Sequence, residues 1–85
     1  MNDKEIKYEI SKILTKISKK KINKKKLLLN FDYFEEGYVD SLNILKLLFE
    51  IENKYKINFS NKELSYSKIK KIDNLVKIIK KKISK

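Results

Sequence analysis

The chain has 85 residues and a formal charge of +11, and all 22 of its basic residues are Lys. It contains no Cys, His, Pro or Trp, which excludes disulfides, Cys/His metal sites, thiol nucleophiles and His-based acid–base catalysis. Because a chain of this length builds a single hydrophobic core, we expect one domain over residues 1–85.

The balance of apolar and charged residues favours a folded protein. An apolar content of 41% is ordinary for a globular domain. No apolar run approaches the roughly 20 residues of a transmembrane helix, and the first residues lack the pattern of a secretory signal. We therefore expect a cytoplasmic protein without stable membrane insertion.

The first predicted element is a helix over residues 3–19, followed by a long loop over residues 20–40. The helix is indicated by one apolar stripe at helical spacing, formed by Ile6, Ile10, Ile13, Leu14 and Ile17. The loop has no regular period but is expected to bury its apolar side chains, Leu27, Leu28, Leu29, Phe31 and Phe34. Loops this long are uncommon in compact domains and tend to be functional.

A second helix is predicted from Ser41 to about Tyr55, with apolar side chains on two faces. The larger set is the predicted core face and comprises Ile44, Leu47, Leu48, Ile51 and Tyr55. The smaller set lies on a separate face and comprises Leu42, Leu45 and Phe49. Either another part of the domain covers this smaller set, or it is a surface for a partner.

The last third of the chain predicts a short element and then a third long helix. Ser60 and Glu63 have the spacing of a capping box, so a short helix or turn should follow them. The final helix is indicated by Ile72, Leu75, Val76, Ile79 and Ile83. The predicted fold is thus all-α, a small four-helix bundle of three main helices and one short helix, with a long loop between helices one and two.

Charge is distributed unevenly along this sequence. Residues 1–26 and 53–85 are strongly basic, whereas residues 30–52 hold one Lys and six acidic residues, Asp32, Glu35, Glu36, Asp40, Glu50 and Glu52. These acidic side chains are either a solvated face or the rim of a docking surface for a basic partner, with the smaller apolar set at its centre. In the second interpretation Glu36, Glu50 and Glu52 contact the partner.

The boundary between the loop and helix two holds the residues that could carry chemistry. Gly37 is the only Gly and permits a positive φ. If Asp40 caps the helix, the Ser41 hydroxyl is exposed at a helix start, where N–H groups and the dipole favour a bound anion such as an esterified phosphate. A Ser at this position is otherwise more often a simple cap.

The run from Phe34 to Leu42, with Gly37, Asp40 and Ser41 at these spacings, resembles the attachment motif of the acyl carrier protein family. The resemblance spans about residues 3–83 in order. Its loop pattern is most similar to that of D-alanyl carrier proteins and other stand-alone carriers. The later positions that fit the family are Glu52, Tyr55, Ile57, Phe59 and the final helix.

This resemblance implies that a phosphopantetheinyl transferase, using Mg²⁺, attaches a 4′-phosphopantetheine group from coenzyme A to Ser41. The thiol of this arm would carry an acyl or aminoacyl group as a thioester, which agrees with the absence of Cys. In the family, the residue matching Asp40 assists recognition by the transferase. Partner enzymes meet the apolar residues of helix two, here Leu42, Leu45 and Phe49.

The resemblance also implies a monomeric carrier that is not an enzyme and has neither catalytic residues nor a metal site. Its partners would be acyl- or aminoacyl-adenylating ligases or synthases of fatty acid or secondary metabolite biosynthesis. The chain departs from the family in its basic outer helices. It also has Lys71 where the family has Ser or Thr before the last helix, which predicts a cap weaker by about 1 kcal/mol unless Asp73 replaces it.

Two other functions are compatible with parts of the sequence. The +11 charge and the basic last helix would suit a Lys-rich helical module that binds nucleic acid or an anionic membrane, although the lack of Arg and the acidic window argue against it. An enzyme would have to build an acid–base pair from Asp40 and Glu36 beside Ser41, which is a poor template for catalysis.

Overall fold

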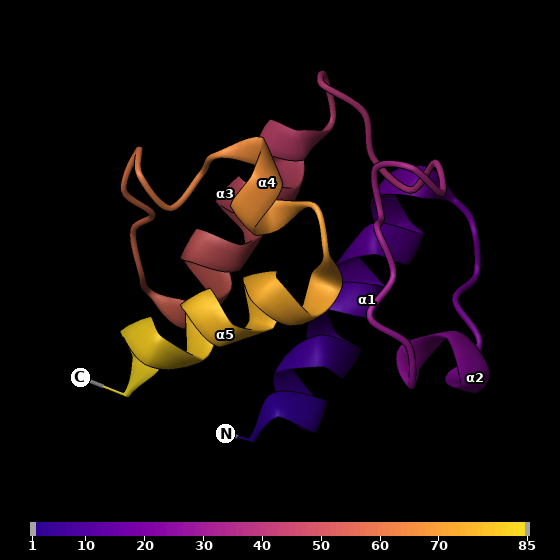
Figure 1. The fold of residues 1–85 in the computed structure, drawn as a ribbon, viewed down its shortest axis with the longest axis horizontal. Helices are drawn as coiled ribbons and strands as arrows, with labels where there is room; N and C mark the ends of the chain where they lie inside the picture. The colour runs from indigo at the N-terminus through magenta and orange to yellow at the C-terminus, as the bar shows by residue number, and fades with distance from the viewer. Residues whose placement is uncertain (1, 85) are drawn as a thin grey trace.

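Three longer helices surround the core of this computed structural model, which describes residues 2–84 (Figure 1). The helices of this part of the chain are α1 (Asp3–Ser18), α2 (Lys24–Leu27), α3 (Ile44–Tyr55), α4 (Tyr66–Ile69) and α5 (Ile72–Ile83). Helix α1 packs against α5, α3 and α2, and α4 packs against α5. The all-α class predicted from the sequence is confirmed for residues 2–84, in which β-structure amounts to one isolated bridge.

Helix α1 begins and packs as its sequence pattern predicts. The Asn2 side chain accepts a 2.9 Å hydrogen bond from the Glu5 N–H, and the Glu5 carboxylate accepts one from the Asn2 N–H, so a capping box starts the helix. The buried stripe of α1 meets the inward faces of α3 and α5. The fully buried side chains of these three helices are Ile6, Ile10, Leu14, Leu47, Ile51, Ile72, Leu75 and Ile79.

Ion pairs at the surface join α1 to α3. The Lys54 Nζ lies 2.9 Å from Glu9 Oε1, and the Lys16 Nζ lies 2.9 Å from Glu50 Oε1. Glu9 also pairs with Lys12, and the hydrogen bonds from Lys54 and Lys12 lower the pKa of the Glu9 carboxyl. Exposed pairs of this kind contribute at most about 1 kcal/mol each. The packing of apolar side chains therefore dominates the stability of the α1–α3 contact.

The long connection between α1 and α3 is anchored to the start of α5. The Tyr33 N–H donates to the Lys70 carbonyl at 3.2 Å, and the Ile72 N–H donates to the Phe31 carbonyl at 3.0 Å. Phe31 and Tyr33 are also buried in the core. Residues 31–33 thus run antiparallel to residues 70–72 and hold the middle of the connection in place.

The same connection supplies the cap of α5. The Asn30 Oδ1 accepts a 3.0 Å hydrogen bond from the Asp73 N–H, whereas Lys71 makes no side-chain cap hydrogen bond. The sequence predicted a weak cap at Lys71 unless Asp73 replaced it. Lys71 is the N-cap residue and supplies no side-chain hydrogen bond, as expected, but Asn30 from the long connection, rather than Asp73, supplies a capping oxygen.

The structure corrects two further predictions for the connection. It contains a fifth helix, the single turn α2, which the sequence analysis assigned to loop. Leu28 and Leu29 are 78% and 57% exposed, so the expectation that all five apolar residues of the loop are buried was wrong for these two. Leu28 is the cap residue that follows α2, and the chain leaves the core there before Phe31 returns to it.

The predicted capping box at Ser60 forms, but it starts a turn rather than a helix. The Ser60 N–H donates to Glu63 Oε1 at 2.8 Å, and the Glu63 N–H donates to Ser60 Oγ at 3.3 Å. The short helix α4 begins later, at Tyr66. Residues 2–84 therefore contain two short helices where one was predicted. Each helix in this range falls short of the length and hydrophobicity of a membrane span.

Candidate functional site

Asp40 organises the turn that leads into α3. Its Oδ1 accepts hydrogen bonds from the Leu42 N–H at 2.9 Å and from the Asn43 N–H at 2.8 Å. Its backbone carbonyl accepts a third bond from the Ile44 N–H at 3.0 Å. One residue thus satisfies three N–H groups that have no partner within the helix. The sequence left open whether Asp40 or Ser41 caps the helix; Asp40 caps the turn before α3, whereas the N-cap residue of the helix itself is Asn43, which makes no side-chain cap hydrogen bond.

Ser41 lies in this turn, with its side chain exposed to solvent. The helix itself starts at Ile44, three residues later than predicted, because the Asp40 carboxylate holds residues 41–43 as a turn. The hydroxyl makes no hydrogen bond with any of residues 2–84. It is therefore open to an incoming group rather than used as a cap.

The arrangement around Ser41 limits how an anion could be bound there. The N–H groups of Leu42, Asn43 and Ile44 already donate to Asp40. The expectation that these N–H groups would receive an anion was therefore wrong. The dipole of α3 still favours negative charge at this end of the helix.

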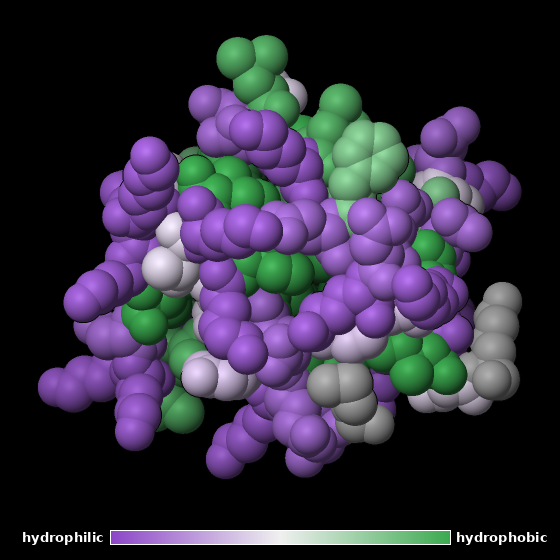
Figure 2. Space-filling view, turned by 180° about the vertical axis from the view of Figure 1, so that it is seen from behind, coloured by the Kyte–Doolittle hydropathy of each residue, from purple (hydrophilic) through white to green (hydrophobic). Residues whose placement is uncertain are grey.

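Leu42, Leu45 and Phe49 form an exposed stripe that begins beside Ser41. Their exposed fractions are 82%, 59% and 62%, whereas Leu47 and Ile51 on the opposite face of α3 are fully buried. The sequence left open whether the stripe is covered, and the structure shows that residues 2–84 leave it uncovered. Figure 2 shows hydrophobic side chains protruding from a largely hydrophilic surface at the upper end of the molecule, the end where Figure 1 places the turn before α3.

An apolar depression of about 290 Å³ lies next to Ser41. Tyr66 forms one wall, and its ring meets that of Phe34 edge to face, with 5.1 Å between the centroids. Phe34 begins the attachment motif recognised in the sequence, whereas nothing in the sequence associated Tyr66 with the site, because it comes from α4. The remaining lining residues are Ile44, Leu45, Leu48, Leu64 and Ile69.

Gly37 turns the chain toward this site with the positive φ that the sequence predicted. Its φ is +83°, a conformation that other residues adopt only with strain. The Lys20 Nζ donates to the Glu36 carbonyl at 3.1 Å, and the Gly37 N–H donates to the Phe34 carbonyl at 3.0 Å. The turn therefore places residues 38–40 on a fixed path toward α3.

Most of the acidic window is engaged within the molecule. Glu36 forms an ion pair with Lys26 and raises the pKa of that lysine through their hydrogen bond. Glu50 pairs with Lys16. Glu52 accepts a 2.9 Å hydrogen bond from the Phe59 N–H, seven residues later.

Two further residues of the window, Asp32 and Glu35, differ in burial. Asp32 is buried and accepts 2.9 Å hydrogen bonds from the N–H groups of Phe34 and Glu35. Glu35 is exposed and has no ion pair within residues 2–84. The structure brings Asp40, Ser41 and Leu42 together but leaves the three predicted rim glutamates, Glu36, Glu50 and Glu52, bound to other parts of the fold.

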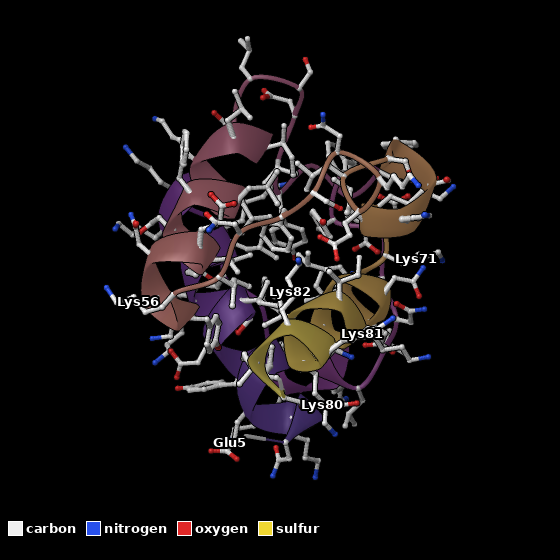
Figure 3. The ribbon with its side chains drawn as sticks, turned by 90° about the vertical axis from the view of Figure 1, so that its left-hand side faces the viewer. Glu5, Lys56, Lys71, Lys80, Lys81 and Lys82 are labelled. Atoms are coloured by element: carbon white, nitrogen blue, oxygen red, sulfur yellow. The ribbon has the colours of Figure 1, made fainter. Side chains whose placement is uncertain are left out.

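The basic end of α5 is a separate feature. Lys80 pairs with Asp3 at 3.0 Å and Lys82 with Glu63 at 2.8 Å, while Lys81 is exposed without an ion pair to residues 2–84. These lysines lie in the last turn of α5, away from the turn before α3 (Figures 1 and 3). Two of the three charges are thus compensated within the fold.

Comparison of the chain with protein-family models, with curated proteins and with solved structures found no match. Within residues 2–84, no group of three or more His, Cys, Asp or Glu side chains is placed to hold a metal ion. The candidate site is therefore defined by its own geometry. It consists of an exposed hydroxyl, a capping carboxylate, an apolar stripe and an adjacent apolar depression.

Proposed function

We propose that the chain is a carrier protein that holds an acyl or aminoacyl group as a thioester on a 4′-phosphopantetheine arm attached to Ser41. The observation that carries the proposal is the exposed Ser41 hydroxyl, which has no hydrogen bond to residues 2–84 and lies in the turn just before α3. The arm would supply the thiol that a chain without Cys cannot provide. The carrier itself performs no reaction.

The residues around Ser41 fit such an attachment. Its hydroxyl is accessible from solvent, and the dipole of the 12-residue helix α3 favours the phosphate that an ester at this position would bring. Asp40 fixes the turn through its two side-chain hydrogen bonds. In this proposal its exposed carboxylate is also recognised by the transferase. The adjacent depression offers apolar side chains to the arm or its cargo.

The helices and the exposed stripe also have roles in this proposal. Helices α1, α3, α4 and α5 correspond to the four-helix bundle of the carrier family, and α2 is an additional turn in the long loop. Leu42, Leu45 and Phe49 are the surface on which cytoplasmic ligases or synthases dock. The carrier acts as a monomer, because a shuttle must present the same face to successive partners.

Loading with coenzyme A tests the proposal directly. Incubation with a phosphopantetheinyl transferase, Mg²⁺ and coenzyme A is expected to add one phosphopantetheinyl group by mass, and Ser41→Ala is expected to abolish the addition. Ser65→Ala is the matched control, because Ser65 is exposed and makes no side-chain cap hydrogen bond. Wild-type protein that stays unmodified while a known carrier is loaded would overturn the proposal.

Two substitutions at Asp40 separate its capping role from its charge. Asp40→Asn keeps a side-chain oxygen for the N–H groups of Leu42 and Asn43 but removes the charge. Asp40→Ala removes both and should destabilise the protein by about 1 kcal/mol. If the transferase recognises the carboxylate, loading of the Asn variant falls while its stability remains close to that of wild type. Unchanged loading of the Asn variant would contradict that recognition.

The Lys-rich alternative has less support in the structure. Binding to nucleic acid or an anionic membrane would use the basic end of α5, where Lys80 and Lys82 are engaged in ion pairs. Retention on DNA or anionic vesicles with a steep salt dependence would favour it.

A further inference from the structure

A groove of about 490 Å³ lies between the end of α1 and the first half of α3. Phe49 contributes its exposed ring, so the groove continues the exposed stripe on the side away from Ser41. The full lining is Lys16, Ile17, Lys19, Lys46, Phe49 and Glu50. Three lysines and one glutamate therefore surround an apolar floor.

The charge that remains available in this groove is positive. Glu50 is paired with Lys16 at 2.9 Å, whereas Lys19 and Lys46 are exposed and have no ion pair within residues 2–84. The backbone of Lys19 is fixed at this edge of the groove, because Lys19 is the C-cap of α1 with a φ of +60° and donates its N–H to the Thr15 carbonyl at 2.7 Å. The predicted acidic rim is thus replaced here by two uncompensated lysines beside Phe49.

We infer that this groove binds a partner segment that carries Asp or Glu on both sides of a large apolar side chain. The apolar side chain covers Phe49, and the carboxylates meet Lys19 and Lys46. This surface combines an apolar centre with a charged edge, as protein interfaces commonly do. The sequence left open whether the acidic window is a solvated face or the rim of a docking surface for a basic partner. On this side of α3, Glu50 is paired with Lys16, and the charges without an ion pair to residues 2–84 are those of Lys19 and Lys46.

The position of the groove connects it to the candidate site. Phe49 follows Leu45 by four residues on the same face of α3, and Leu45 lines the same apolar depression as Ser41, which lies in the turn before the helix. A partner held at Phe49 therefore extends along the exposed stripe to Ser41. The inference names the partner class of the proposed carrier and in that respect rests on the proposed function.

Peptide binding tests the inference. The chain has no Trp, so the fluorescence of a peptide with one Trp flanked by Glu reports binding without a label. We expect this peptide to bind about tenfold more tightly than the same peptide with Gln in place of Glu. The peptide with Lys in place of Glu is expected not to bind.

Variants then locate the binding surface. Lys46→Glu and Phe49→Ser are each expected to weaken binding of the Glu peptide about tenfold. Lys81→Glu makes the same change of charge on α5, outside the groove, and should leave binding close to wild type. If Lys46→Glu and Lys81→Glu lose equal affinity for the Glu peptide, binding depends only on the net charge of the protein, and the inference is overturned. Circular dichroism confirms that each variant is folded.

Two further outcomes are informative. If sedimentation equilibrium shows a dimer that Lys46→Glu dissociates, the occupant of the groove is a second copy of the chain and the inference is wrong. Loading of Ser41 is measured on the same samples by mass. If Ser41 is loaded but the Glu peptide does not bind, the inference about the groove is wrong and the carrier function stands. If the peptide binds but Ser41 is not loaded, the carrier function is wrong and the inference about the groove stands.

Discussion

The Oδ1 of Asn30 accepts a hydrogen bond from the N–H of Asp73, a residue 43 positions later, at a distance of 3.0 Å. The cap of α5 is therefore supplied by the long connection between α1 and α3. With the adjacent bonds between residues 31–33 and 70–72, it ties two distant parts of the chain together. The stability of α5 and the position of the connection consequently depend on each other.

Asn30→Ala should destabilise the protein by about 1 kcal/mol, because it leaves the Asp73 N–H without its capping oxygen. Urea unfolding followed by circular dichroism measures this loss. Asn58→Ala is the matched control, since Asn58 is exposed and its side chain makes no hydrogen bond within residues 2–84. Equal stabilities for the two variants would show that the cap contributes little.

Gly37→Ala should destabilise the protein by about 1 kcal/mol through backbone strain at a φ of +83°. An added Cβ would also lie 2.9 Å from the Lys20 Nζ, but that atom ends a flexible side chain and can move. Adding Lys20→Ala should therefore not restore stability. Gly37→Asn should cost less than Gly37→Ala, because Asn tolerates positive φ. Thermal unfolding compares the variants, and rescue by Lys20→Ala would assign the loss to the clash instead.

Tyr33→Phe should stabilise the protein by about 1 kcal/mol at neutral pH. The Tyr33 side chain is fully buried, and its hydroxyl has no hydrogen-bond partner within residues 2–84, so removing the hydroxyl relieves a desolvation cost. Tyr8→Phe, at an exposed position, is the control and should leave stability unchanged. A destabilised Tyr33→Phe variant would indicate that the hydroxyl has a favourable partner.

The same substitution should alter the response to alkaline pH. Burial, followed by the charge of Asp32, raises the pKa of Tyr33. The stability that this raised pKa provides is fully present below the ordinary tyrosine pKa of about 10. It is lost as the pH rises through the higher pKa that Tyr33 has in the folded state. Wild type should therefore lose more stability than Tyr33→Phe between about pH 9 and 11. Parallel curves for the two proteins would contradict this expectation.

Glu9→Gln should make the protein less sensitive to acid while lowering its stability at neutral pH. Hydrogen bonds from Lys54 and then Lys12 lower the pKa of Glu9 in the folded state. The stability that this shift provides is present above the ordinary carboxyl pKa and is lost as the pH falls through the lowered value. Urea unfolding at a series of acidic pH values measures the difference. Glu35→Gln is the control, because Glu35 is exposed and has no ion pair in the described residues, and its stability should depend on pH as that of wild type does.

The long helices could be predicted from the sequence because each buries a periodic apolar stripe. The prediction for α1 ended at residue 19, and the helix ends at Ser18. The start of α3 was placed at Ser41 rather than Ile44, since periodicity does not reveal that a carboxylate holds the first residues as a turn. Helix α2 was missed, because a single turn has no period. Its local signal is Asn23, whose side chain accepts a hydrogen bond from the Lys26 N–H.

The periodic pattern of α3 also predicted part of the candidate site. Helical phase separated Leu42, Leu45 and Phe49 from the core, and all three are exposed. Helical periodicity shows which face of a helix a residue occupies, but it does not show which residues of other elements that face contacts. The sequence therefore did not reveal that Glu50 pairs with Lys16 on α1 or that Tyr66 of α4 forms a wall beside Ser41.

The bonds between residues 31–33 and 70–72 also determine how a group joined to Ser41 could move. They leave only a short span between Tyr33 and the Asp40 cap, and Gly37 bends that span along a set route. In the proposed carrier, the base of the arm is therefore joined to a turn whose following N–H groups are held by Asp40. The reach of the far end would then depend chiefly on the length of the arm.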